Sequence, residues 1–477
     1  MQLVAYGAQD IYLTGNPQIT FFKVVYRRHT NFSMESIKQT FDGNADFGGD
    51  VVATISRNGD LVHKMYLEHD VLLSCTDGNE KYLVICTNYG SNLIKECEIE
   101  IGGQRIDKHY SHWHSVYSQL NEFNPTGYHE NGIKHIDSGG EQVTHFANSI
   151  YRSTLFNTMS GNGGAVTSGV SLTDNDSVAD RGSWSKLTHS GTTGDTSQTK
   201  IFIPLYFWFC RNPGLALPLI ALQYHEVKIK MTFENIDNLA HECAESDAGS
   251  KEDNSFFGDT ITDPDYIEYS TVESVTNKRF DLWCDYIYLD TDERRRFAQV
   301  SHEYLIEQLQ FSNHSGNTTI DLNFNHPVKE LIWTSNRNIN DSSINIFKPS
   351  ASLTGGDTNG VKQHKNIKNR EPRSLSGNFL LKLNGHDRFK SRDTKYFTRT
   401  QVWQNHTGYG STINSDGIAV YSFALKPEEH QPSGTCNFSR IDSAELISSD
   451  ETNLNIYAVN YNVLRIMSGM GGLAYSN

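Results

Sequence analysis

Three histidines lie close together in the segment HYSHWH, at positions 109, 112 and 114. Imidazole is a common zinc ligand, so the cluster raises the question of a metal site. If the segment is helical, His109 and His112 share a face at a spacing of three residues, whereas His114 points elsewhere. No carboxylate or cysteine stands at a matching position, and a structural zinc ion needs four ligands. We therefore expect no metal and interpret the histidines as belonging to a helix surface or an interface.

The glycine-rich segment Gly469–Gly472 is the nearest approach to a phosphate-binding loop. It follows a strand-like run, but no helix comes after it, and phosphate loops rely on a helix N-terminus. We interpret it as a flexible C-terminal turn, with Leu473 and Tyr475 packing locally. The sequence contains neither GxSxG nor HExxH, and no acidic pair belongs to a recognisable hydrolase motif. We thus predict no catalytic residue, no cofactor and no enzymatic activity.

Arg27, Arg28 and His29 form a short basic patch. Two interpretations stay open, a solvated strand end or a contact with anionic partners. Whole-chain charge is acidic, with 41 basic against 56 acidic residues and a formal net charge of −15. Direct nucleic-acid binding is therefore not expected.

Seven cysteines are present, an odd number, and none forms a CxxC pair. Free thiols in a reducing compartment are the expected state. The start MQLVAYGAQD lacks the features of a secretory signal, and no apolar run reaches the ~20 residues of a membrane span. We expect synthesis in the cytoplasm of the cell that makes the protein.

Asparagine glycosylation sequons occur seven times, at Asn31, Asn175, Asn313, Asn317, Asn340, Asn405 and Asn437. Several are expected by chance, and sequon glycosylation depends on a secretory route. Asn340 and Asn405 fall in predicted loops and are therefore the candidates for glycosylation.

One pattern occurs twice along the chain, in the same order. RNGDLVHKMYL at 57–67 matches FNHPVKELIW at 324–333, and the glycine turn of IEIGGQRID at 99–107 matches LKLNGHDRF at 381–389. An aromatic strand and a short strand after a loop follow each time, at 204–222 and at 420–441. Because the unit is far longer than the ~20–50 residues of a solenoid repeat, it indicates a duplicated domain.

Period-two hydrophobic runs bounded by Gly-rich turns predict strands throughout both halves. Helical spacing predicts one amphipathic helix at about Ser111–Phe123. Polar segments at 155–200, 237–276 and 335–376 are expected to be loops, and 390–417 is a shorter variable segment. The predicted fold is all-β, with two tandem eight-stranded antiparallel jelly rolls, short helices and long outer loops.

The expected domains are an N-terminal arm at 1–22, a first jelly roll at 23–290, a linker helix at 291–302 and a second jelly roll at 303–477. The linker is predicted from Asp290 and Glu293, whose spacing is that of a helix N-cap and its capping-box partner.

At this point seven sequence blocks resemble the double jelly-roll major capsid proteins of nucleocytoplasmic large DNA viruses. They are residues 3–32, 56–61, 101–110, 212–228, 303–311, 431–442 and 455–477. The blocks span both ends and both halves, and several exceed ten residues.

The resemblance implies a structural protein of the virion capsid, in which a homotrimer forms a pseudo-hexagonal capsomer of a large icosahedral shell. It further implies neighbouring capsomers, minor capsid proteins and penton proteins as partners, outward loops, and an N-terminal arm beneath the shell in contact with partners or an internal membrane. The alternatives are a carbohydrate-binding β-sandwich protein, suggested by the aromatic content and long loops, or a minor capsid paralogue. An enzyme on a jelly-roll scaffold would need a His-rich metal set on strands, and no such set is visible.

Overall fold

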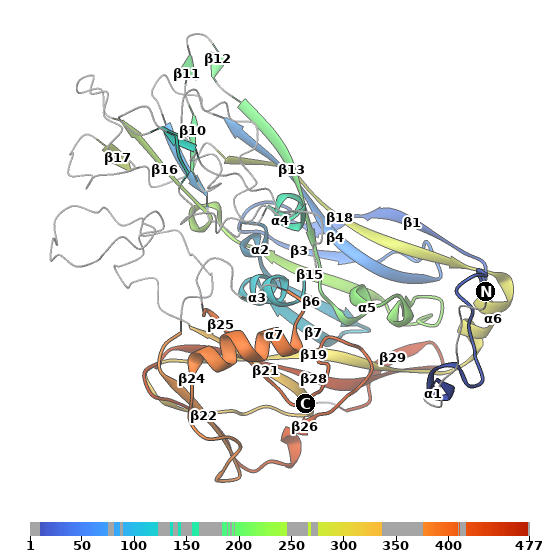
Figure 1. Ribbon diagram of the computed structural model, residues 1–477. Coiled ribbons are helices and arrows are strands. Elements are labelled where there is room, and N and C mark those ends of the chain that lie inside the picture. The colour runs from blue at the N-terminus through green and yellow to red at the C-terminus, as the bar shows by residue number, and fades with distance from the viewer. Residues whose placement is uncertain are drawn as a thin grey trace, which may run out of the picture.

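The computed structural model describes residues 10–475, apart from 75–80, 86–88, 123–133, 137–141, 145–154, 162–183, 188, 191–192, 195, 246–265, 269–274, 336–374, 409 and 411–415. These described residues form two β-barrels, one above the other in Figure 1. In each barrel two antiparallel sheets face one another across a hydrophobic core.

The first barrel has the strand order of a jelly roll. Its larger sheet runs β1 (Phe32–Gln39), β18 (Val275–Leu289), β4 (Leu61–Ser74) and β13 (Thr196–Pro204), with β14 (Leu217–Pro218) also paired to β4. Its other sheet runs β2 (Phe41–Gly43), β3 (Asp50–Thr54), β15 (Val227–Phe233), β6 (Ile94–Ile101) and β7 (Gln104–Tyr110). Strands distant in sequence are thus neighbours, as double-sheet jelly rolls require.

The second barrel repeats this order. Its larger sheet runs β19 (His302–His314), β28 (Leu454–Met467), β21 (Pro327–Ser335) and β25 (Ile418–Ser422), with β26 (Cys436–Asn437) on β21 and β29 (Met470–Leu473) on β28. Its other sheet runs β20 (Thr319–Asp321), β27 (Ala444–Ser448), β22 (Asn378–Leu383) and β23 (His386–Asp387), with β24 (Arg392–Asp393) on β22.

The sequence repeat corresponds to equivalent strands. In the first barrel Leu217 of β14 pairs with Val62 of β4. In the second, Cys436 of β26 pairs with Val328 of β21. Val62 and Val328 also match when the two repeat segments are aligned at their last residues, Leu67 and Trp333. The pairing and the repeat therefore agree on which residues of the two large sheets correspond.

Helix α6 (Thr291–Gln299) joins the barrels, and Asp290 is its N-cap, with the carboxylate accepting from the Thr291 N–H. The other helical elements are α1 (Ile11–Thr14), α2 (Tyr89–Leu93), α3 (Ser111–Asn121), α4 (Leu155–Ser160), α5 (Trp208–Arg211), α7 (Gln401–Asn405), the π-helical turn Tyr396–Thr400 and 3-10 turns at Pro213–Leu215, Ile236–Asn238 and Phe438–Arg440. No described helix is long and apolar enough to cross a bilayer.

Four further strands form a small sheet in the order β10 (Trp184–Leu187), β5 (Lys81–Ile85), β16 (Ala240–Glu245) and β17 (Tyr266–Glu268). Two further pairs of strands form hairpins. In one, β8 (Lys134–Ile136) pairs with β9 (Gln142–Thr144), and in the other, β11 (His189–Ser190) pairs with β12 (Thr193–Gly194). Figure 1 shows β10, β16, β17 and the β11–β12 hairpin at upper left, while α6 and the N-terminal segment lie at the opposite, right-hand end.

The jelly-roll class and the helix at 111–121 are confirmed, but several element predictions are wrong. Residues 155–200 include α4, β10 and the start of β13, and residues 237–276 include β16 and β17. The aromatic strand predicted at the start of 204–222 is wrong, because β13 ends at Pro204 and α5 follows it. The helical run 396–405 was expected to be part of a variable loop. Residues 336–374 of the third predicted loop lie outside the described residues.

Candidate functional site at the junction of the two barrels

Helix α3 of the first barrel packs on the outer face of the large sheet of the second. Trp113 is 1% exposed, and its ring centroid lies 5.1 Å from that of Tyr457 on β28. The apolar cluster at this contact contains Trp113, Val116, Leu120, Ile332, Val402, Ile418, Val420, Tyr457 and Val459. Burying side chains of this size contributes roughly 1.5–3 kcal/mol each. The cluster therefore stabilises the contact between the two barrels.

The three histidines of the HYSHWH segment lie at this junction but do not share one face. His109 belongs to β7, where its Nε2 is 3.0 Å from the Asp107 carboxylate. His114 is buried beside it, with ring centroids 5.9 Å apart, whereas His112 Nδ1 lies 2.8 Å from the Tyr457 hydroxyl. The expected pairing of His109 with His112 is therefore wrong, because the strand continues to Tyr110. Burial and the nearby His109 lower the pKa of His114 to about 3, so its ring is neutral.

A buried ion triad connects the barrels on one side of α3. Arg211 of α5 contacts Glu307 of β19 at 2.6 Å, and Lys329 of β21 contacts the same carboxylate at 2.8 Å. Lys329 Nζ also donates to the Pro427 carbonyl. The guanidinium of Arg211 lies 4.6 Å from the centroid of the Tyr117 ring, a cation–π contact. Because Arg211 belongs to the first barrel and Glu307 to the second, the triad spans the junction.

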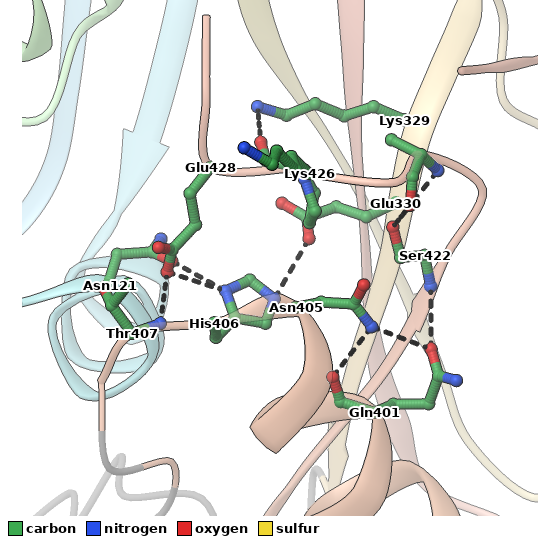
Figure 2. A network of polar contacts seen from close by, with 12 residues as sticks. Asn121, Lys329, Glu330, Gln401, Asn405, His406, Thr407, Ser422, Lys426 and Glu428 are labelled. Atoms are coloured by element: carbon green, nitrogen blue, oxygen red, sulfur yellow. Dashed lines mark hydrogen bonds and ion pairs between the residues drawn. The ribbon is translucent and has the colours of Figure 1, made fainter. Parts of the chain in front are cut away.

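A second network surrounds His406, directly after α7 (Figure 2). His406 Nε2 is 3.1 Å from Glu330, and Nδ1 is 2.8 Å from Asn121 Oδ1 and 3.2 Å from Glu428. Glu428 also accepts from the Thr407 N–H. Burial alone would lower the pKa of His406, but the charges of Glu330 and Glu428 raise it to about 9. The same pairing lowers the pKa of the buried Glu330 despite its desolvation.

The two networks are electrically balanced. Their cations are Arg211, Lys329 and protonated His406, and their anions are Glu307, Glu330 and Glu428, three of each sign. Buried charges stabilise only when they are paired with good geometry, and removing one partner leaves the other uncompensated. Among these contacts, the Arg211–Glu307 ion pair and the His406–Asn121 hydrogen bond cross the junction. Sliding of one barrel on the other would break both, which favours one relative position of the barrels.

Metal-binding and thiol chemistry are not supported by the described residues. Within them, no group of three or more His, Cys, Asp or Glu side chains converges as metal ligands. Cys97, Cys210, Cys284 and Cys436 are free thiols, and the first three are buried. Burial raises the pKa of Cys97, Cys210 and Cys284, which keeps these thiols protonated.

The remaining motifs have structural positions. Gly469 lies in the turn of the β28–β29 hairpin, and residues 470–472 belong to strand β29, where Met470 pairs with Met467. Arg27 and Arg28 are exposed, in a segment whose apolar side chains are also exposed, such as Phe22 at 99% and Tyr26 at 87%. Residues 1–9 of the predicted arm lie outside the described residues.

Of the two glycosylation candidates, Asn405 lies among the residues that the structure describes. Asn405 was expected in a loop, but it is the last residue of α7, and its amide donates to the Gln401 carbonyl at 2.8 Å. A glycan on this nitrogen would compete with that hydrogen bond. Asn340 lies outside the described residues.

Sequence reasoning missed the ion networks. One signal was available, because Lys329 and Glu330 interrupt the apolar strand PVKELIWTS, in which every residue after Pro327 is buried. Charged residues are almost never fully buried unless paired. Their partners are Glu307 of β19 and His406 after α7, which lie elsewhere in the sequence and carry no pattern that marks them.

Comparison with known families gives two matches that lie one after the other along the chain. A family model described as "Major capsid protein N-terminus" matches residues 20–290. A second, described as "Large eukaryotic DNA virus major capsid protein", matches residues 293–472.

Full-length relatives and a solved structure agree with these matches. The chain is 46% identical to the major capsid protein of Pyramimonas orientalis virus and 38% identical to that of Paramecium bursaria Chlorella virus 1, each over 100% of this chain and 99% of the relative. It is also similar to a chain of the quasi-atomic model of the PBCV-1 virus capsid, with 34% identity and a TM-score of 0.63, covering 96% of this chain and all of that one.

Proposed function

The chain belongs to the major capsid proteins of large eukaryotic DNA viruses, and from that premise we propose that three copies form a pseudo-hexagonal capsomer. The chain is a structural protein of the virion capsid, assembles with neighbouring capsomers and is not an enzyme. The observation that carries the trimer proposal is the buried junction. Two similar barrels locked side by side give each copy two near-equivalent units, and a threefold ring of such pairs has six.

We further propose that the capsomer is polar along the barrel axes. The end carrying β10, β16, β17 and the β11–β12 hairpin would face outward, and the end with α6 would face inward. What supports this is the position of the N-terminal segment at the α6 end. Its exposed apolar side chains need a covering surface, which neighbouring capsomers, minor capsid and penton proteins or the headgroups of an internal membrane would supply.

The division into domains at 1–22, 23–290, 291–302 and 303–477 is likewise a proposal. It is supported by strands that begin at Phe32 and end at Leu289 in one barrel, by α6, and by β19 starting at His302. Glycosylation of Asn340 or Asn405 is retained as a proposal, with intact-mass and peptide spectrometry of native virions as its test.

Light scattering on the purified protein tests the trimer. The expected mass is three times 53.8 kDa, held on dilution through the micromolar range because obligate interfaces are large. A well-folded protein that stays monomeric throughout this range would contradict the proposal.

A further inference from the structure

The contact between α3 and the second barrel shows how one barrel of this protein receives a helix. A groove runs between the outer face of the β21–β25–β28 sheet and helix α7, bordered by Ile332, Tyr457 and Val402. Helix α3 fills it, with Trp113 as the largest inserted side chain. We call this the filled groove.

The first barrel has a groove in the corresponding place, and it is open. A cavity of about 560 Å³ lies between the outer face of the β4–β13–β18 sheet and helix α3. Its wall includes Lys64, Tyr66, Phe202 and Asp285 from the sheet, and Tyr117 and Glu122 from the end of α3 and the residue that follows it. We call this the open groove.

The correspondence between the two grooves is set by strand pairing. Tyr66 lies four residues after Val62, and Ile332 lies four residues after Val328, the two residues paired to the short strands β14 and β26. Across the next strand, Tyr66 pairs with Trp283 and Ile332 pairs with Tyr457. Trp283 therefore occupies the place that Tyr457 has in the second barrel.

The floor at this position is aromatic in both barrels. The Tyr66 ring stacks on Trp283 with centroids 6.5 Å apart, and Phe202 meets Tyr66 edge-on at 6.0 Å. All three side chains are half-buried. In the second barrel the equivalent Tyr457 is covered by Trp113, whereas in the first barrel Tyr66 and Phe202 face the cavity, which Phe156 and Met159 of α4 also line.

The helix that corresponds to α3 is the helical run 396–405 that ends in α7, because each is the first helix after the glycine-turn hairpin of its barrel, β6–β7 in one and β22–β23 in the other. Trp113 lies in the first turn of α3, and Trp403 lies in the last turn of the continuous helical run 396–405. Trp113 is 1% exposed, but Trp403 is 80% exposed, while its neighbour Val402 is buried against α3. Each copy thus presents one uncovered tryptophan and one open groove.

We propose that Trp403 of one copy inserts into the open groove of a second copy and packs on Tyr66 and Phe202, in the way that Trp113 packs within the chain. This inference rests on the proposed trimer and names its anchor residues. A projecting side chain and a receiving groove at different places make a head-to-tail contact, which closes into a ring when the rotation permits. Buried tryptophans are frequent energetic anchors of such interfaces.

The first test measures assembly of the full chain by light scattering and analytical ultracentrifugation. Trp403→Ala should keep the circular dichroism of the wild type but weaken the trimer, with roughly a thirtyfold higher concentration at half-dissociation. Tyr224→Ala is the matched control, since Tyr224 is 75% exposed and lies by the β28–β29 turn, away from α7. It should assemble like the wild type.

The second test is chemical cross-linking. Chains carrying Trp403→Cys and chains carrying Phe202→Cys are mixed under mild oxidation, and disulfide-linked peptides are identified by mass spectrometry. A 202–403 bond between different chains supports the proposal.

The outcomes separate the two proposals. A monomeric wild type overturns both the trimer and its anchor. A trimeric wild type with unchanged assembly of Trp403→Ala and no 202–403 bond overturns the anchor alone, and a minor capsid protein or a small molecule then becomes the occupant of the open groove.

Discussion

At the scale of single residues, His406 has an unusual environment, because every group that faces its ring is an acceptor. Glu330 lies at Nε2, while Asn121 Oδ1 and Glu428 lie at Nδ1. Both ring nitrogens therefore carry protons, and the residue serves as a cation inside the junction. A histidine can do this at neutral pH only where nearby carboxylates outweigh the cost of burial.

The pH dependence of stability follows from this proton. The pKa of His406 is raised from 6.5 to about 9 in the folded protein. Its contribution is thus complete below pH 6.5 and is lost as pH rises through 9, a loss of about 3 kcal/mol. Urea unfolding of the wild type at pH 6 and pH 9.5 should show this decrease. His406→Gln should show a clearly smaller decrease between the same two pH values, and an equal decrease in both proteins would refute the assignment.

Removing the carboxylate partner should be costly below pH 9, where His406 is charged. Glu330→Gln leaves His406 without its closest anion in a buried site, and breaking such a pair destabilises by roughly 3–5 kcal/mol. Glu429→Gln is the control, because Glu429 pairs with Lys426 on the surface, with both side chains more than half exposed. Its effect should stay below about 1 kcal/mol. Denaturant titrations of the two variants measure the difference.

At the scale of elements, the strands were predictable where one face is buried and the other is not. In β15 the burial alternates strictly between buried and half-buried from Val227 to Phe233, which is the period-two signal. Helix α3 was predictable for the parallel reason, since Trp113, Val116 and Leu120 recur on one side. The sequence repeat then predicted that the chain contains two barrels.

The prediction failed where tertiary contacts override local pattern. The aromatic run after Pro204 was expected to continue a strand, yet Trp208–Arg211 turns into α5 because all its rings are buried and no face alternates. The helical run 396–405 was missed because only Phe397, Thr398, Gln401 and Val402 are buried in two short turns of different helix type. The junction networks join strands, helices and loops that are far apart in sequence, so no local window contains them.

Helix α3 should be the element on which the junction most depends. Trp113→Ala removes the largest side chain of the apolar cluster, and large-to-small changes of this kind cost roughly 3–5 kcal/mol. We expect a lower thermal midpoint and faster proteolysis at the α6 linker. Tyr224→Ala is the control, since Tyr224 is 75% exposed. Equal loss of stability in both variants would contradict the role assigned to α3.

At the scale of the whole molecule, the N-terminal segment is the part that gains least from the fold. Ile11, Tyr12, Ile19 and Phe21 are each more than two-thirds exposed. Deleting residues 1–22 should therefore leave barrel stability and trimer formation unchanged. It should impair assembly into shells, because the covering surface for these side chains belongs to partners.

Two measurements check the deletion, light scattering for the trimer and electron microscopy for assembled shells. Loss of the trimer would mean that the segment belongs to the fold of the capsomer. Normal shells would mean that it has no part in assembly.

The locked junction also has a mechanical consequence. Most two-domain chains have small, polar interfaces and move about a hinge. Here apolar packing, the Arg211–Glu307 ion pair and the His406–Asn121 hydrogen bond hold the barrels together, so α6 links two barrels that do not move about a hinge. Each chain is then a stiff tile. The curvature of a closed shell must then arise at the contacts between capsomers. A measurement of local stiffness over the particle should find high stiffness within capsomers and lower stiffness along their edges.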